Sequence, residues 1–241
     1  MLKVGEDRIG RVAIPIRNGL NSTDAMWADK QSKSLKSMCL LIFFPPTIFR
    51  IFIVACMTSF LYFAYGSNML TQRLTARCAG AVPLGKALAR DHQVGFFLKG
   101  ADGSAKAGMV PKKGAQSWGV LFEMPLAEQG VLDGFEGEGE YYARETIPIM
   151  HDFQGIVAEA VTYLAHSEHL TNALLPFDWY RALCAGGATQ HRLPAKTLEK
   201  ISSHDVFAGP YVSAGAAEGH SLALQALHAA GFADETGNLL L

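Results

Sequence analysis

The stretch "FLYFAYGSNML", residues 60–70, passes from apolar to polar character and back within a few positions. Its first part is aromatic and apolar, which is typical of a buried strand. "YGSN" at 65–68 has turn character, and the following "MLTQRL" places apolar residues at helical spacing, with Ser67 or Asn68 as a candidate cap. The stretch therefore predicts a strand, a tight turn and a helix in direct succession.

A turn of this kind has two possible uses. The backbone N–H groups at the start of a helix are unpaired, and together with the helix dipole they favour a carboxylate or a phosphate. "YGSN" supplies one glycine and no following lysine, so it is neither a P-loop nor a dinucleotide fingerprint. Taken alone, the turn fits an ordinary helix cap as well as an anion cradle.

Composition places the chain among globular proteins. At 241 residues, with 49% apolar and 18% charged residues, it is long and apolar enough for one sizeable core. Residues 1–56 carry 8 Lys and Arg against 4 Asp and Glu, whereas the remainder carries 13 against 18. The larger part is mildly acidic and has no basic stripe, which argues against nucleic-acid binding. Scattered cysteines without a CxxC motif indicate a reducing compartment and no metal framework.

The first 56 residues differ from the rest. Residues 38–57 read "MCLLIFFPPTIFRIFIVACM", close to the roughly 20 apolar residues of a membrane helix, but Pro45-Pro46 and Arg50 interrupt the run. It also begins too late for a signal peptide. Three interpretations stay open: a poor membrane anchor, an apolar segment packed on the domain, or residues upstream of the true start. We expect the start at Met57, with 1–56 a disordered or extraneous extension and 57–241 the folded domain.

The remaining pattern predicts an α+β domain, with most strands before the helices. A Gly-rich loop is expected at 100–114, a short helix at 126–137, a hairpin turn at 151–155 and helices from 174 onward. Because strands of this length close readily around a side-chain core, we expect a small mixed β-barrel or a strongly curved sheet flanked by helices. The predicted strands lie at 60–65, 94–98, 117–124, 141–150 and 156–166.

Acidic residues gather among glycines in "LDGFEGEGEYYAR", residues 132–144; they are Asp133, Glu136, Glu138 and Glu140. Their spacing does not fit a calcium loop, and a solvated acidic loop is the ordinary interpretation. Glu136, however, directly follows Phe135, at the end of an apolar helix face expected to comprise Leu126, Val131, Leu132 and Phe135. A half-buried carboxylate has a raised pKa and can exchange a proton near neutrality, so Glu136 is a candidate general base.

Other reactive side chains are weaker candidates. Cys184 could be a thiol nucleophile with His191 as its base, but a cysteine on a packed helix is more often a small buried hydrophobe. Tyr180 could offer its hydroxyl to a ligand or pack in the core. His166 and His169 lack further ligands at metal spacing, so no metal site is expected.

Four motifs in order resemble the gamma-glutamylcyclotransferase family, from about residue 59 to about residue 211. "YFAYGSNM" is similar to the family's active-site loop, and "SWGVLFEMP" with "LDGFEG" is similar to the strand and helix that lead to its catalytic glutamate. "AVTYLA" is similar to a strand that brings a tyrosine to the pocket. "WYRALCAGGATQHRLP" is similar to a helix whose leading tyrosine contacts the ligand.

The resemblance implies a cofactor-independent enzyme that cyclises a small γ-glutamyl substrate to 5-oxoproline. It implies Glu136 as the general base and a substrate site formed by Tyr62, Tyr65, Gly66, Ser67, Asn68, Tyr163 and Tyr180. A cytoplasmic location follows, with membrane attachment through 38–56 as the alternative. A non-catalytic binding module on the same fold is a second alternative.

The substrate's leaving group and the oligomeric state stay open. An amino acid, an amine, glutathione and a carrier-bound acyl chain all hang from the γ-carbonyl in related branches. Asn68 resembles the branch that acts on γ-glutamyl amino acids, and the loop expected at 100–114 is a candidate cover for the leaving-group side.

Overall fold

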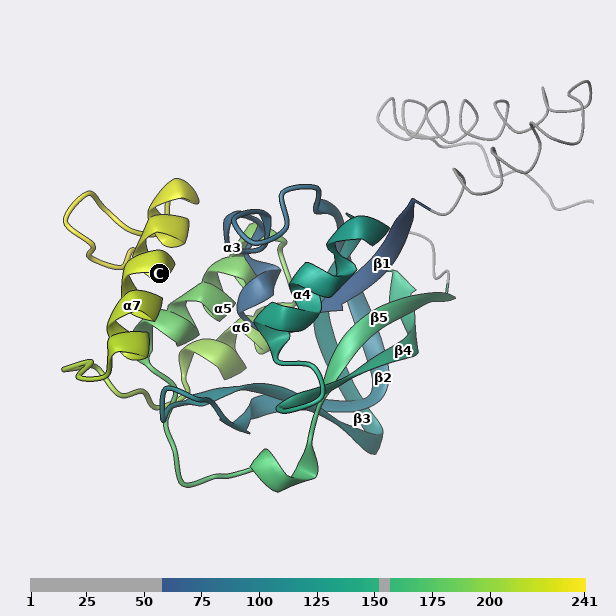
Figure 1. Ribbon diagram of the computed structural model, residues 1–241, viewed down its shortest axis with the longest axis horizontal. Helices are drawn as coiled ribbons and strands as arrows, with labels where there is room; N and C mark the ends of the chain where they lie inside the picture. Colours follow the sequence, from purple (N-terminus) through teal and green to yellow (C-terminus); the bar gives the residue numbers. More distant parts are fainter. Residues whose placement is uncertain (1–57, 152–156) are drawn as a thin grey trace, which may run out of the picture. The chain divides into compact units, whose positions relative to one another are not determined.

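Five strands close into a barrel in the order β1-β3-β2-β4-β5 (Figure 1). The computed structural model describes residues 58–151 and 157–241, so the predictions for 1–56 and Met57, and most of the turn at 151–155, lie outside the described residues. The strands are β1 (Ser59–Ala64), β2 (Val82–Lys99), β3 (Ala105–Pro125), β4 (Tyr142–His151) and β5 (Val157–Ala165). The predicted α+β barrel is confirmed.

Strand β1 closes the barrel because it pairs antiparallel with β3 and parallel with β5. Its end is fully buried, with Phe63 at 0% exposure and Ala64 at 1%. Gly119 on β3 permits this close pairing, since a Cβ there would lie 2.3 Å from the Ala64 carbonyl oxygen. The turn at 65–68 therefore begins at a buried position, where β1 ends inside the barrel.

The Gly-rich loop expected at 100–114 is wrong in its extent. Only residues 100–104 form the turn of the hairpin, and 105–114 belong to β3. Ala105, Ala107 and Met109 are buried, which is the alternation of a strand that covers a core. A register shift beside Asp91, whose φ is 58° and whose carboxylate accepts the Gly114 N–H, bends this long hairpin.

Helices cover one side of the barrel (Figure 1). The helical segments are η2 (Ser67–Met69), α3 (Thr71–Thr75), η3 (Leu126–Glu128), α4 (Gln129–Glu136), η4 (Ser167–His169), α5 (Asp178–Gln190), α6 (Ala195–Ser202) and α7 (Ala214–Ala229). Helix α5 is the central one: most of its length is buried, and it contacts η2, α6 and α7. No helix in the described ranges is both long and apolar enough to span a membrane.

The prediction that α4 buries a broad apolar face is also wrong. Leu132 is fully buried, but Leu126, Val131 and Phe135 are 45%, 47% and 53% exposed. Helix α4 meets the barrel along a narrow strip, one residue per turn, and Leu132 and Glu136 at i and i+4 share that strip. Glu136 faces inward because of Leu132, not because of Phe135.

Neither Ser67 nor Asn68 caps a helix with its side chain. The residues before η2 and α3 are Gly66 and Leu70, and neither position has a side-chain cap. Helix α5 supports the turn instead, since a Cβ on Gly187 would lie 2.5 Å from the Leu70 nitrogen and 2.6 Å from the Met69 carbonyl carbon. Only glycine allows the two backbones to pack this closely.

We expect Gly187→Ala to destabilise the fold by about 1–3 kcal/mol, because backbone atoms of the turn would have to shift. Urea unfolding followed by circular dichroism measures this. Gly130→Ala is the matched control, since a Cβ on this helical glycine meets nothing within 4 Å and should leave stability equal or slightly higher. Equal stability of the Gly187 variant and the wild type would contradict the packing described above.

Candidate active site

All eight residues predicted for the site line one small pocket, together with Ala107 and Tyr142. They are Tyr62, Tyr65, Gly66, Ser67, Asn68, Glu136, Tyr163 and Tyr180. We call this the inner pocket; its volume is about 30 Å³, close to the space of a single water molecule. It can hold one small polar group of a ligand, not a whole ligand.

Glu136 and the turn at 65–68 meet directly. The Asn68 side-chain amide donates to Glu136 Oε1 at 2.6 Å and to the Tyr62 hydroxyl at 3.2 Å, and its carbonyl oxygen accepts from Arg77 at 3.1 Å. Asn68 is 4% exposed, and its bond to Tyr62 is buried, whereas those to Glu136 and Arg77 are partly buried. One amide thus fixes the carboxylate of Glu136 against the turn.

Two opposing effects set the proton affinity of Glu136. Burial raises the pKa of its carboxyl above the ordinary value, because a low-dielectric surrounding disfavours the charged form. Arg77, Arg73 and the Asn68 hydrogen bond act against burial, and the net pKa is still raised. A carboxylate of this kind can accept a proton and later return it.

The tyrosine hydroxyls of the site differ in their hydrogen-bond partners: that of Tyr180 accepts a backbone N–H, and those of Tyr65 and Tyr142 donate to backbone carbonyls. The Tyr180 hydroxyl accepts the Ala107 N–H at 3.2 Å and lies beside Gly66, where an added Cβ would come within 3.5 Å of it. Tyr65 and Tyr142 instead use their hydroxyls on backbone carbonyls, at 2.5 and 2.8 Å. Burial raises the pKa of the Tyr180 phenol, so it stays protonated and can donate to a ligand.

Tyr163 lines the inner pocket with its ring, but its hydroxyl points to α4. It donates to Asp133 Oδ1 at 2.7 Å, and the other oxygen of Asp133 pairs with Arg144 on β4. Asp133 is one turn before Glu136. The contact therefore holds α4 on the barrel, while the predicted role of Tyr163 in substrate binding stays a prediction.

The turn also presents backbone donors. The N–H groups of Met69 and Leu70 donate to the carbonyls of Gly66 and Ser67. Those of Ser67 and Asn68 donate to no other group in the described ranges. Because both residues line the inner pocket, these two N–H groups are available to an anion or a carbonyl oxygen.

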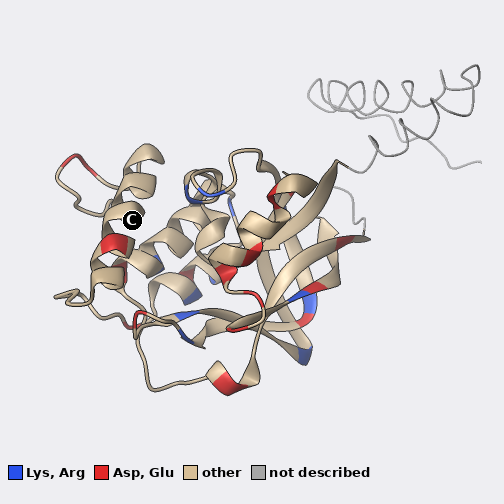
Figure 2. Ribbon diagram, viewed as in Figure 1, with Lys and Arg blue, Asp and Glu red and all other residues tan. Residues whose placement is uncertain are grey.

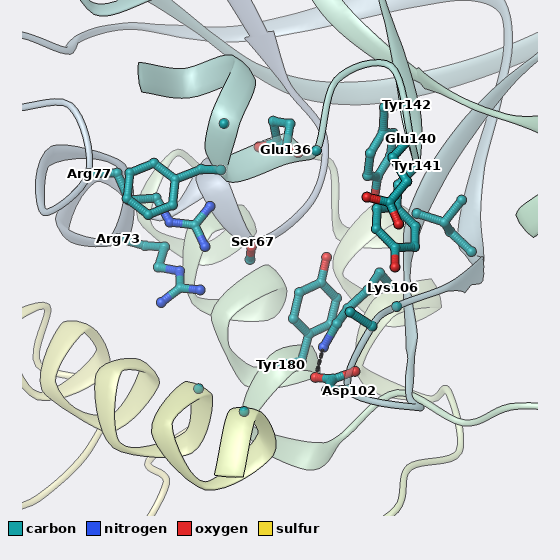
Figure 3. A pocket seen from close by; sticks show the side chains of 18 of the residues that line it. Ser67, Arg73, Arg77, Asp102, Lys106, Glu136, Glu140, Tyr141, Tyr142 and Tyr180 are labelled. Atoms are coloured by element: carbon teal, nitrogen blue, oxygen red, sulfur yellow. Dashed lines mark hydrogen bonds and ion pairs between the residues drawn. The ribbon is translucent and has the colours of Figure 1, made fainter. Parts of the chain in front are cut away.

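The inner pocket opens into a larger hollow, the outer cleft, of about 690 Å³. The two share Ser67, Glu136, Tyr142 and Tyr180. Figure 3 shows the Tyr180 hydroxyl directed toward Ser67, with Arg73 and Arg77 on one side of the cleft and Tyr141, Glu140 and Lys106 on the other. Residues 100–102 of the hairpin turn also line the cleft, so part of the loop predicted at 100–114 does lie there.

Arg73 and Arg77 are functional candidates that the sequence analysis missed. They sit at i and i+4 of "RLTAR", directly after the turn, and both line the outer cleft. Figure 2 shows basic positions on α3 and just after it, near acidic positions on α4. Two arginines on one helix face after "YGSN" were the signal that could have identified them.

The thiol and the histidines have other surroundings. Cys184 is 1% exposed, and burial raises the pKa of its thiol to about 12, so the thiolate is disfavoured. His191 bonds Thr71 at 3.0 Å. Across residues 58–151 and 157–241, no three His, Cys, Asp or Glu residues come together as a metal-binding group.

Comparison with known proteins agrees with this geometry. The model of the family described as gamma-glutamyl cyclotransferase, AIG2-like, matches residues 62–182. The gamma-glutamylcyclotransferases of Bos taurus and Homo sapiens are 28% and 27% identical over 152 residues, which cover 60% of this chain and 78% of each relative. A solved structure named gamma-glutamyl cyclotransferase superposes with a TM-score of 0.58 at 25% identity, covering 66% of this chain and 96% of that one.

The matched range contains every predicted site residue and ends inside α5. It includes the end of β1, the turn and α4 with Glu136, all of which contribute to the inner pocket. The chain therefore belongs to the gamma-glutamyl cyclotransferase, AIG2-like family.

Proposed function

We propose that this chain cyclises the γ-glutamyl group of a small substrate to 5-oxoproline and releases an amine or an amino acid. The observation that carries the proposal is the position of Glu136. Its carboxylate has a raised pKa, lies 2.6 Å from the Asn68 amide, and shares the inner pocket with the backbone donors of the turn. A base and an anion site in one pocket suit attack on a carbonyl.

The reaction needs no nucleophile from the protein. The α-amino nitrogen of the γ-glutamyl group attacks its own γ-carbonyl carbon, so a five-membered ring forms as the new C–N bond is made. The former amide C–N bond then breaks. Folding the substrate so that the amine meets the carbonyl supplies much of the rate, because intramolecular attack has a large effective molarity.

Glu136 balances the protons in this scheme. The α-ammonium loses two protons, one to become a nucleophilic amine and one as the ring C–N bond forms, and the leaving nitrogen gains two. The Glu136 carboxylate accepts each proton in turn and returns it to the leaving nitrogen, so the amine is released as an ammonium and the carboxylate is regenerated. The raised pKa suits both halves of the transfer, because a stronger base accepts the proton and a weak acid still returns it.

The turn would stabilise the charge that develops on the substrate. Ser67, Asn68 and Tyr180 line the inner pocket, whose size suits a single carboxylate or carbonyl oxygen, and the two backbone N–H groups and the phenol are the donors that we assign to that oxygen. Donors fixed before the reaction stabilise a developing oxyanion without reorganising. The inner pocket would thus hold one carboxylate or carbonyl oxygen of the γ-glutamyl part, and the rest of the substrate would lie in the outer cleft.

A non-catalytic binding module would fit an exposed Glu136 far from the turn. The hydrogen bond between Asn68 and Glu136 favours the enzyme instead. Membrane attachment through 38–56 concerns residues outside the described ranges.

We expect Glu136→Gln to reduce 5-oxoproline release by ~10²–10⁴-fold, because the amide keeps the shape but cannot accept the ammonium proton. Chromatographic detection of 5-oxoproline from γ-glutamyl dipeptides measures this, and calorimetry should show that substrate binding persists. Glu138→Gln is the matched control, since Glu138 is exposed and outside the inner pocket. A near-normal rate in the Glu136 variant, or an equal loss in the control, would rule the mechanism out.

The pH profile should follow Glu136. Only the ionised carboxylate is a base, so kcat/KM should fall as the pH drops through the raised pKa of Glu136. Asn68→Ala removes a hydrogen bond that lowers this pKa, so the acid limb should move to higher pH. An acid limb at the same pH in both proteins would assign the titration to another group.

Tyr180→Phe should chiefly raise KM, since the phenol lies at the junction of the inner pocket and outer cleft. The expected loss is roughly 10-fold, the weight of a hydrogen bond to a charged group. Steady-state kinetics separate KM from kcat. If kcat fell while KM stayed constant, Tyr180 would act in the chemical step and not in binding.

A further inference from the structure

A third hollow, which we call the side cavity, adjoins the outer cleft. Its volume is about 290 Å³, and it shares Arg73, Arg77 and Phe135 with the cleft. Its remaining lining is contributed by α3 and α7: Gln72, Ala76, Leu222, Gln225, Ala226 and Ala229. The two guanidinium groups therefore stand where the polar cleft meets a largely apolar cavity.

Arg73 is the unsatisfied group at this junction. Its Nε is buried without a hydrogen-bond partner, and no hydrogen bond or ion pair joins its guanidinium to another side chain in the part of the chain that the structure describes. Burial lowers its pKa to about 10, which leaves it cationic at neutral pH. Figure 3 shows its side chain directed into the cleft.

The neighbouring charges leave this cation available. Arg77 is already engaged by the Asn68 oxygen and by the Phe135 ring, 4.8 Å from its guanidinium carbon. Lys106 and Asp102 pair at 2.5 Å and neutralise each other. Glu136 is held by Asn68, and Glu140 also lines the cleft, so the three cations and the three carboxylates of the cleft lining balance. Arg73 is the cation among them that no side chain in the described ranges pairs with, so a carboxylate on the ligand would complement it.

A γ-glutamyl amino acid carries a carboxylate on its leaving group, whereas a γ-glutamyl amine does not. Two places beside Arg73 can accept parts of a ligand. The guanidinium can bind a carboxylate, and the side cavity next to Phe135 can take an apolar group. An amino acid with an apolar side chain presents both groups from one carbon atom.

We propose that the leaving group is an apolar amino acid, whose carboxylate binds Arg73 and whose side chain lies in the side cavity between Phe135 and α7. This inference rests on the proposed function, because it places a carboxylate or carbonyl oxygen of the γ-glutamyl part in the inner pocket. Helix α7 lies outside the range 62–182 of the family match. The cavity wall is therefore a feature of this chain that family membership does not provide.

Three substrates test the proposal: the γ-glutamyl amides of leucine, glycine and isopentylamine. Isopentylamine keeps the leucine side chain and lacks the carboxylate, whereas glycine keeps the carboxylate and lacks the side chain. We expect kcat/KM for leucine to exceed that for isopentylamine by roughly 10-fold or more, the weight of a charge-assisted hydrogen bond. Leucine should also exceed glycine by roughly 10-fold or more, since apolar groups in a pocket contribute on this scale.

Arg73→Gln should abolish the preference for leucine over isopentylamine, and Arg73→Lys should restore part of it. The ratio of two substrates in one variant is the informative quantity, because Arg73 also lowers the pKa of Glu136 and that effect acts on both substrates alike. Equal rates for leucine and isopentylamine in the wild type would overturn the inference while leaving the proposed function intact.

The side cavity is tested separately by Ala229→Phe, which fills it from an exposed position on α7. We expect the ratio of leucine to glycine to fall by roughly 10-fold. Ala217→Phe on the same helix is the matched control, since Ala217 is exposed and lines neither the cleft nor the cavity. An unchanged ratio in the Ala229 variant would overturn the placement of the side chain. If no 5-oxoproline came from any of the three substrates, the proposed function would fail first.

Discussion

The site depends on the hydrogen bond between Asn68 and Glu136, which lie 68 positions apart in the chain. A carboxylate removed from water is costly unless donors surround it, so Glu136 can turn inward only where such a donor already stands. Asn68 is that donor because β1 ends in the barrel interior and delivers the turn at the inner end of α4. The barrel thus brings the carboxylate of Glu136 and the turn at 65–68 together in one pocket.

Two further contacts keep this arrangement rigid. Helix α5 presses on the turn at Gly187, where backbone meets backbone, and Tyr163 ties α4 to the strands through Asp133. Neither contact uses a group that the proposed reaction needs. A reactive carboxylate with a raised pKa requires such support, because relaxation of α4 toward water would return its pKa to the ordinary value.

The barrel strands and the position of Glu136 could be predicted from sequence because each depends on local pattern or on a short motif. The extent of the β2–β3 hairpin could not, since residues 105–114 have the composition of a loop and form a strand only by pairing with β2. Phe135 was expected to pack inward, but α4 buries only the strip through Leu132. The hairpin's length, the exposure of Phe135 and the direction of Arg73 into the cleft all depend on tertiary contacts, which the local sequence pattern does not contain.

Two of the three cations that line the cleft, Lys106 and Arg73, differ in whether another side chain neutralises them. Lys106 is paired with Asp102 and lies over the rings of Phe177, Trp179 and Tyr180, each within 5.5 Å of its ammonium. Arg73, in contrast, keeps a buried nitrogen without a partner, a state that costs about 1–3 kcal/mol. A fold that fully satisfies one buried cation and leaves the other open a few side chains away has a cost that ligand binding would remove. Because Arg73 lacks a hydrogen-bond partner among the described residues, we assign it to ligand binding. Lys106, which is paired with Asp102 and packs on the Tyr180 ring, has a structural role instead.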